Sequence, residues 1–172
     1  MINLELQLSV EDLRWEGLLN EPLETFFKKY IYSALTCSSV LNNMPKHIEV
    51  SLLLTNDQNI QELNQEYRGK NKPTNVLSFP QEENISILKN MDTCVLLGDI
   101  VLSIETIELE SKQQQKLMHH HLSHLIVHST LHLIGYDHET DEEAEEMESL
   151  EIAILQQHNI PNPYESDSAY MV

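Results

Sequence analysis

The chain has 172 residues, 41% of them hydrophobic and 22% charged, which is typical of one globular domain with its own core. Its 28 acidic residues against 10 lysines and arginines give a net charge of −18, which argues against broad, nonspecific nucleic-acid binding but permits a local basic groove. No apolar run approaches the roughly 20 residues that span a bilayer, and two widely separated cysteines fit a reducing cytoplasm.

The hydrophobic pattern predicts strands and helices in irregular alternation. Two-residue alternation and short apolar runs predict strands over residues 2–8, 48–54, 76–79 and 95–102. Apolar residues at helical spacing predict helices over about 23–35, 56–67, 105–134 and 140–157, the second capped by Thr55 or Asn56 and the last by a Thr140–Glu143 capping box. We therefore expect a single α+β domain over residues 1–158.

Three segments lack a regular period. Residues 68–75 form a basic loop with Gly and Pro, and residues 81–93 are polar and irregular, as in a flap or a long hairpin connection. Residues 159–172, with two prolines and small polar side chains, are expected to form a flexible tail.

Three histidines near the end of the longest predicted helix have the spacing of a metal site. His128 and His132 stand four apart in an apolar segment, so both imidazoles lie on one helical face. Gly135 suits the left-handed position that ends a helix, and the turn after it brings His138 towards the same point. Zinc held by three imidazoles keeps a fourth position for water, whose pKa it can lower to about 7.

Neighbouring polar residues allow several roles. His124 lies one turn before His128 and could be a second-shell donor, a base, a substrate contact or a residue at the edge of the core, whereas a fourth His ligand would close the site. Asp137 could orient a ligand imidazole or cap the last helix. The side chains of residues 119–121, all histidines, are expected to be solvated. Ser129 stands where metzincin proteases carry their general-base Glu, which argues against proteolysis.

Three ordered motifs resemble the YbeY family of bacterial rRNA maturation factors. Residues 128–138 are similar to its signature His-Gly-x-Leu-His-Leu-x-Gly-Tyr-Asp-His, residues 63–80 resemble its arginine loop and following strand, and residues 97–100 resemble a third characteristic segment. The departures are Ser129 in place of Gly, and Asn71 and Asn75 in place of Asp.

The resemblance implies a zincin-like α+β fold with a four-stranded mixed sheet. It implies a single-strand-specific, metal-dependent endoribonuclease that acts in 16S rRNA 3′-end maturation and ribosome quality control, with single-stranded RNA and the small ribosomal subunit and its proteins as partners. The resemblance implies that His128, His132 and His138 bind one zinc ion per chain. It also implies that Arg68 is the arginine needed for activity.

The residues suggest how such a site would act. Arg68 would clamp the scissile phosphate and stabilise its developing charge, and Lys70 and Lys72 would hold the flanking backbone. The general base stays open between metal hydroxide, His124 and the 2′-hydroxyl of the substrate. Two alternatives also stay open: a metal hydrolase with another substrate, and a non-catalytic assembly factor whose metal fastens the last helix while its acidic surface docks on ribosomal proteins.

Overall fold

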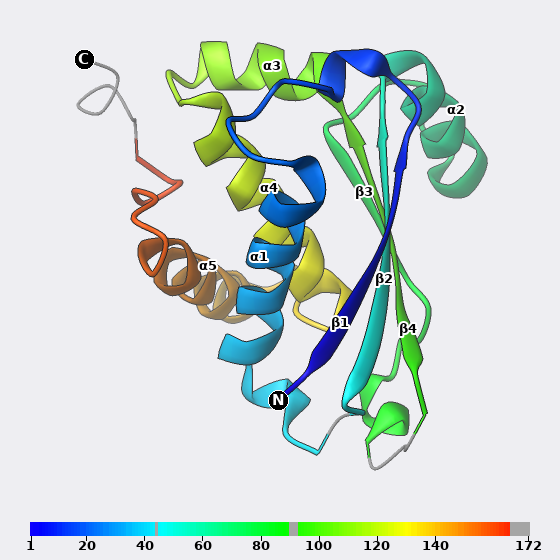
Figure 1. Ribbon diagram of the computed structural model, residues 1–172, viewed down its shortest axis with the longest axis vertical. Helices are drawn as coiled ribbons and strands as arrows, with labels where there is room; N and C mark the ends of the chain where they lie inside the picture. The colour runs from blue at the N-terminus through cyan, green and yellow to red at the C-terminus, as the bar shows by residue number, and fades with distance from the viewer. Residues whose placement is uncertain (44, 90–92, 166–172) are drawn as a thin grey trace.

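The centre of the fold is a four-stranded mixed sheet, shown in the computed structural model of Figure 1, which describes residues 1–43, 45–89 and 93–165. The spatial order of its strands is β1 (Asn3–Val10), β2 (His47–Thr55), β4 (Val95–Ser103) and β3 (Val76–Pro80). The first three strands are parallel, and β3 pairs antiparallel with β4. This arrangement confirms the expected α+β class and the four predicted strands.

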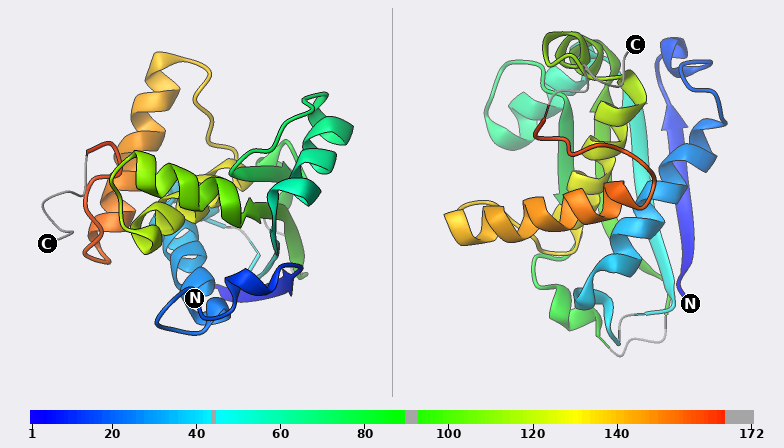
Figure 2. Two further views of the ribbon diagram at one scale, coloured as in Figure 1. Left: turned by 90° about the horizontal axis from the view of Figure 1, so that it is seen from above. Right: turned by 90° about the vertical axis from the view of Figure 1, so that its left-hand side faces the viewer.

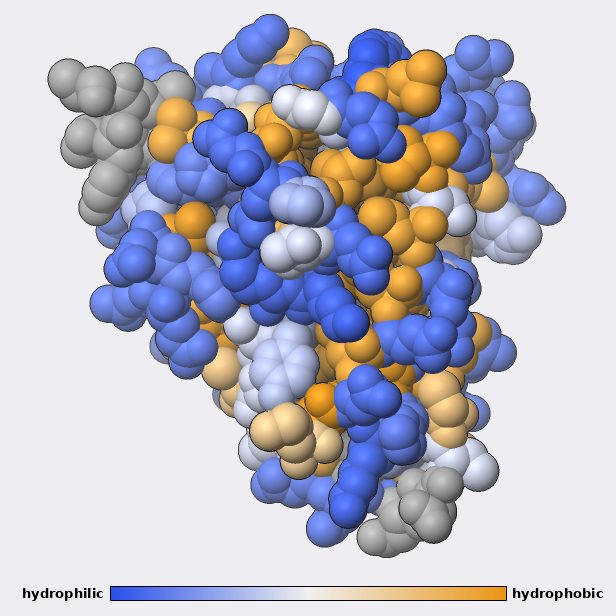
Figure 3. Space-filling view, viewed as in Figure 1, coloured by the Kyte–Doolittle hydropathy of each residue, from blue (hydrophilic) through white to orange (hydrophobic). Residues whose placement is uncertain are grey.

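Helices cover both faces of this sheet unequally. Figure 2 shows α1 (Leu23–Cys37), α4 (Met118–Leu133) and α5 (Asp141–Gln156) on one side and α2 (Asp57–Arg68) on the other. Helix α3 (Ile104–Gln113) crosses one end of the sheet. Helix α4 packs between the sheet and the outer helices, which explains why eleven of its residues are buried. A band of apolar side chains marks the junction between β1 and the helical layer in Figure 3.

The expected single helix over residues 105–134 is wrong, because the chain breaks between α3 and α4. Gln115 adopts a φ of 55°, and the N–H of Lys116 donates to the carbonyl of Ser111 over 2.8 Å. These features form a Schellman-type helix end, for which glycine is the usual residue at the left-handed position. Because a glutamine occupies that position here, the sequence carries no glycine signal for the break.

The expectation of solvated histidines at residues 119–121 fails at two positions. His120 and His121 are buried at the start of α4, and Nε2 of His121 lies 2.7 Å from a carboxylate oxygen of Glu110 in α3. The reason is the break described above, since it folds α3 back against α4 and places this polar stretch between helices.

The structure describes parts of the two irregular segments at residues 81–93 and 159–172. Residues 81–94 connect the antiparallel pair β3 and β4, so this segment is a long hairpin connection, and it contains a short 3-10 helix at Ile85–Leu88. Its residues 90–92 lie outside the described residues. In the expected tail, residues 166–172 also lie outside them, whereas Ile160 is buried in the main core.

Candidate metal centre

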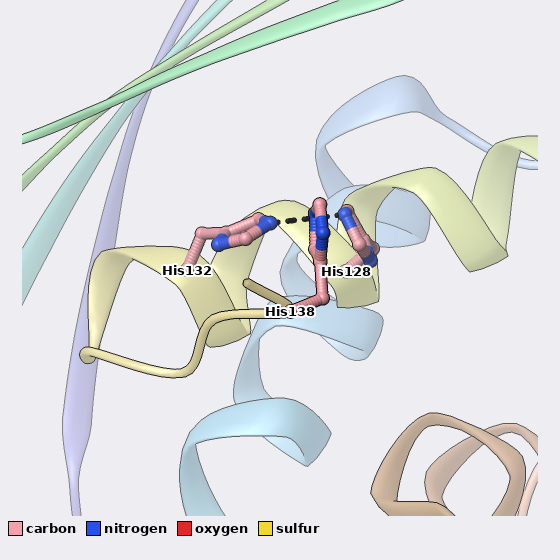
Figure 4. A group of neighbouring side chains, drawn as sticks. All are labelled: His128, His132 and His138. Carbon is pink, nitrogen blue, oxygen red and sulfur yellow. Dashed lines mark hydrogen bonds between the residues drawn. The ribbon is translucent and has the colours of Figure 1, made fainter. Parts of the chain in front are cut away.

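The end of one helix and the loop after it bring the three predicted histidines together. His128 and His132 lie in the last two turns of α4, and His138 lies in the loop before α5. Gly135, with a φ of 102°, ends the helix as predicted, and its N–H donates to the carbonyl of His132 over 3.1 Å. One ring nitrogen from each histidine lies within 4.8 Å of the other two, and the rings converge as Figure 4 shows.

Hydrogen bonds on the far side of two rings decide which nitrogens face the centre. Nδ1 of His132 lies 2.9 Å from the carbonyl oxygen of Tyr136, and Nδ1 of His128 lies 2.6 Å from Oε1 of Glu151. A carbonyl and a carboxylate can only accept, so we assign the proton of each neutral ring to Nδ1. The carboxylate behind His128 is a common device for orienting metal ligands.

The distance between the two Nε2 atoms shows that the residues fit a metal. The Nε2 atoms of His128 and His132 lie 3.0 Å apart, and with both protons on Nδ1 neither Nε2 has a proton to donate. Two lone pairs that face each other at this distance repel unless a cation lies between them. Both nitrogens can reach one zinc ion at about 2.0–2.1 Å. The arrangement therefore fits a divalent metal.

The electrostatics of the site maintain the protonation states that metal binding needs. Burial lowers the pKa of His132, and the nearby ring of His128 lowers it further, so His132 is neutral at neutral pH. Burial by itself raises the pKa of Glu151, but His124 and His128, whose ring nitrogens face its carboxylate, outweigh it and hold this pKa at about 2. Glu151 is therefore an ionised acceptor although its side chain is fully buried.

His124 and Asp137 lie beside the histidine cluster without joining it. Nε2 of His124 lies 3.4 Å from Oε1 of Glu151. The ligand atoms of His124, His128 and Glu151 lie within 4.8 Å of one another, whereas His124 is not part of the set formed by His128, His132 and His138. It therefore does not close the site as a fourth ligand. Asp137 accepts the backbone N–H of His138 over 2.8 Å, whereas the cap of α5 is Thr140, in the predicted capping box.

The histidines line a cleft that also receives Arg68. This cleft of about 490 Å³ is bounded by the three histidines, Arg68, Ser78 of β3 and residues 82–83, both glutamates, of the hairpin connection. Arg68 is the last residue of α2, rather than part of the loop, and its Nη2 lies 3.4 Å from the carbonyl oxygen of Ser78. Helix α2 and helix α4 thus meet at one cleft from opposite faces of the sheet.

The remaining predicted positions lie away from this cleft. Lys70 and Lys72 are exposed on the loop after α2 and are not among the cleft-lining residues in the described part of the chain. Ser129, the departure from the family signature, is fully buried in α4 and is likewise not part of the described cleft wall.

The sequence reasoning did not identify Glu151. A signal for it exists, because Glu151 shares the buried stripe of α5 with Met147, Ile154 and Leu155. A carboxylate on the apolar face of an amphipathic helix is rarely buried without a partner. Which partner it meets depends on how α5 packs against α4.

Known proteins of one family are similar to this chain over most of its length. The family model described as "Endoribonuclease YbeY" matches residues 17–159. A Rhizobium etli protein named Endoribonuclease YbeY is 41% identical over 99% of this chain and 99% of its own length. One of the same name from Magnetococcus marinus is 49% identical over 68% of this chain and 83% of its own length.

One solved structure has a similar fold. The solution structure of TM1509 from Thermotoga maritima matches with a TM-score of 0.55 and 22% identity, over 90% of this chain and 92% of that protein.

Within the described residues, none of the helices has the length and apolar character needed to cross a membrane.

Proposed function

Because this chain belongs to the YbeY endoribonuclease family, we propose that it is a single-strand-specific, metal-dependent endoribonuclease that matures the 3′ end of 16S rRNA in the cytoplasm. The observation that carries this proposal is the shared cleft, in which Arg68 from α2 meets His128, His132 and His138. A cationic side chain beside a metal site suits an anionic backbone such as that of RNA.

The three histidines would hold one zinc ion per chain. Their nitrogens fit such an ion in number and spacing, and the tautomers assigned to His128 and His132 direct Nε2 towards it. Zinc bound there would supply a Lewis acid, which can lower the pKa of water to about 7 and polarise a phosphodiester. Glu151 and the carbonyl of Tyr136 orient the two helical imidazoles, so the ligands are set before the metal arrives.

Arg68 would bind the scissile phosphate and stabilise the charge that develops on it. Its guanidinium donates to the backbone carbonyl of Ser78, which lies on the β3 side of the cleft. Glu82 and Glu83, from the hairpin connection, also line the cleft. The two carboxylates repel phosphate, so the substrate backbone is drawn to the Arg68 side of the cleft. Lys70 and Lys72, outside the cleft, would contact the flanking backbone as it leaves.

The rival functions fit the cleft less well. A purely structural metal needs a closed set of four ligands, whereas His124 lies apart from the three-histidine group. A peptide hydrolase would need a general base where Ser129 stands, and this residue is buried in α4. Binding to the small ribosomal subunit and its proteins, and a role in ribosome quality control, belong to the same proposal and use the outer surface.

The test is cleavage of single-stranded RNA by variants whose metal content is measured in parallel. We expect Arg68→Ala to lose about 10²–10³-fold in cleavage rate, the usual effect of removing one charge-stabilising donor, while retaining its metal. His128→Ala should lose both metal and cleavage. Lys70→Ala, a charge removed outside the cleft, should change the rate only a few-fold, and an RNA duplex should resist cleavage.

Two outcomes would decide against the proposal. Robust cleavage by Arg68→Ala would remove this arginine from the mechanism. A wild-type protein that binds metal but leaves single-stranded RNA intact would favour the non-catalytic assembly factor. Residual activity in the His128→Ala preparation serves as the check for contaminating nucleases.

A further inference from the structure

The chain after α5 folds back onto the helical layer. Asn159 adopts a φ of 58° at the end of α5, and Ile160 is buried in the main core. Nζ of Lys116, just before α4, donates to the carbonyl oxygen of Pro163. The right-hand view of Figure 2 shows this segment running back across α4. Residues 159–165 are thus held beside the buried side of the metal centre.

Tyr164 in this segment reaches the carboxylate that orients His128. Its hydroxyl donates to Oε2 of Glu151, and its ring packs on the ring of His124 with centroids 5.4 Å apart. The other carboxylate oxygen, Oε1, faces Nδ1 of His128 at 2.6 Å and Nε2 of His124 at 3.4 Å. Three groups from two parts of the chain therefore surround one fully buried carboxylate.

The division of the two oxygens between partners fixes the direction of the carboxylate. Because Oε2 is held by Tyr164, Oε1 is directed at His128, whose proton is then kept on Nδ1 and whose Nε2 faces the cluster. Without the hydroxyl, Oε2 would be a buried acceptor with one donor fewer, and the carboxylate could rotate to relieve this. His128 would then lose the alignment that His132 and His138 require.

We propose that Tyr164 is a positioning residue of the metal centre, which acts through Glu151 on His128 and makes the segment 159–165 part of that centre. The inference rests on the proposed function, since it assumes that the three histidines bind a metal. It assigns a role to a segment that the sequence pattern predicts to be part of a flexible tail.

The test compares the zinc affinity of the full-length wild type with that of Tyr164→Phe, by competition against a chromophoric chelator. We expect the variant to bind zinc about 10-fold more weakly, at the lower end of the effect of changing an outer-shell partner. Tyr32→Phe is the matched control, because Tyr32 on α1 is an exposed tyrosine like Tyr164 but does not contact Glu151. Its zinc affinity should equal that of the wild type.

A purely structural role for Tyr164 gives a different result. It would lower the unfolding temperature of the metal-free and zinc-loaded protein equally and leave the zinc affinity unchanged, and this outcome overturns the inference. If Tyr164→Phe does not fold, Glu151→Gln tests the same link, with an expected loss of 10–100-fold in affinity and no loss as the overturning result. A wild type that binds no zinc would refute the proposed metal site itself and would be recognised before any variant is compared.

Discussion

Gly98 is the position at which one added methyl group should disturb both the fold and the candidate site. Gly98 lies in β4 with a φ of 152°, and a Cβ there would lie 2.3 Å from the carbonyl oxygen of Phe79 and 2.9 Å from Cδ2 of Leu133. Overpacking of this kind costs about 1–3 kcal/mol, and the strained backbone conformation costs about 1–2 kcal/mol more. We expect Gly98→Ala to lower the free energy of unfolding by about 2–5 kcal/mol, measured by urea denaturation.

The same substitution should reach the metal centre. Phe79 belongs to β3, which forms one wall of the cleft, and Leu133 directly follows His132. Either β3 or the end of α4 has to move to admit the methyl group, so zinc affinity should fall together with stability.

Gly17 provides the matched control. Its φ is 74°, but a Cβ there would meet nothing within 4 Å, so Gly17→Ala carries only the backbone strain of about 1–2 kcal/mol. The difference between the two variants isolates the clash with Phe79 and Leu133. Equal losses in Gly98→Ala and Gly17→Ala would refute the steric reasoning.

Two further predictions concern titration and charge. Because burial, followed by the neighbouring ring of His128, lowers the pKa of His132 below its ordinary 6.5, the unfolded chain takes up the proton first. The contribution of His132 to the stability of the metal-free protein should thus be fully present above pH 6.5 and be lost as the pH drops through the lowered pKa. Thermal melts should show a smaller fall of the unfolding temperature with pH in His132→Gln than in the wild type. Asn75 donates to both carboxylate oxygens of Glu110, over 3.1 and 3.0 Å, so Asn75→Asp should cost about 1–3 kcal/mol at neutral pH. Urea unfolding should show this loss shrinking in acid, and an equal loss in Asn71→Asp, at an exposed position, would contradict it.

Long-range contacts explain most of what the sequence reasoning missed. Glu151 could be recognised as an unusual residue on a buried stripe, but its meeting with His128 depends on the packing of α5 on α4. The end of α3 at Gln115 was missed for a local reason, because no glycine marks that left-handed position. The buried state of His121 then followed from the same break, since α3 returns alongside α4 and supplies Glu110.

The sequence by itself determined the features whose spacing is local. Four strands, the cap at Thr140, and the convergence of His128, His132 and His138 around the turn at Gly135 follow from helix and strand periods that neighbouring residues impose. Only the tertiary structure decided that Arg68, at the end of α2, shares a cleft with those histidines. Such a contact depends on the stacking of two helices on opposite faces of one sheet, and side-chain periodicity describes which face is buried but not what lies across it.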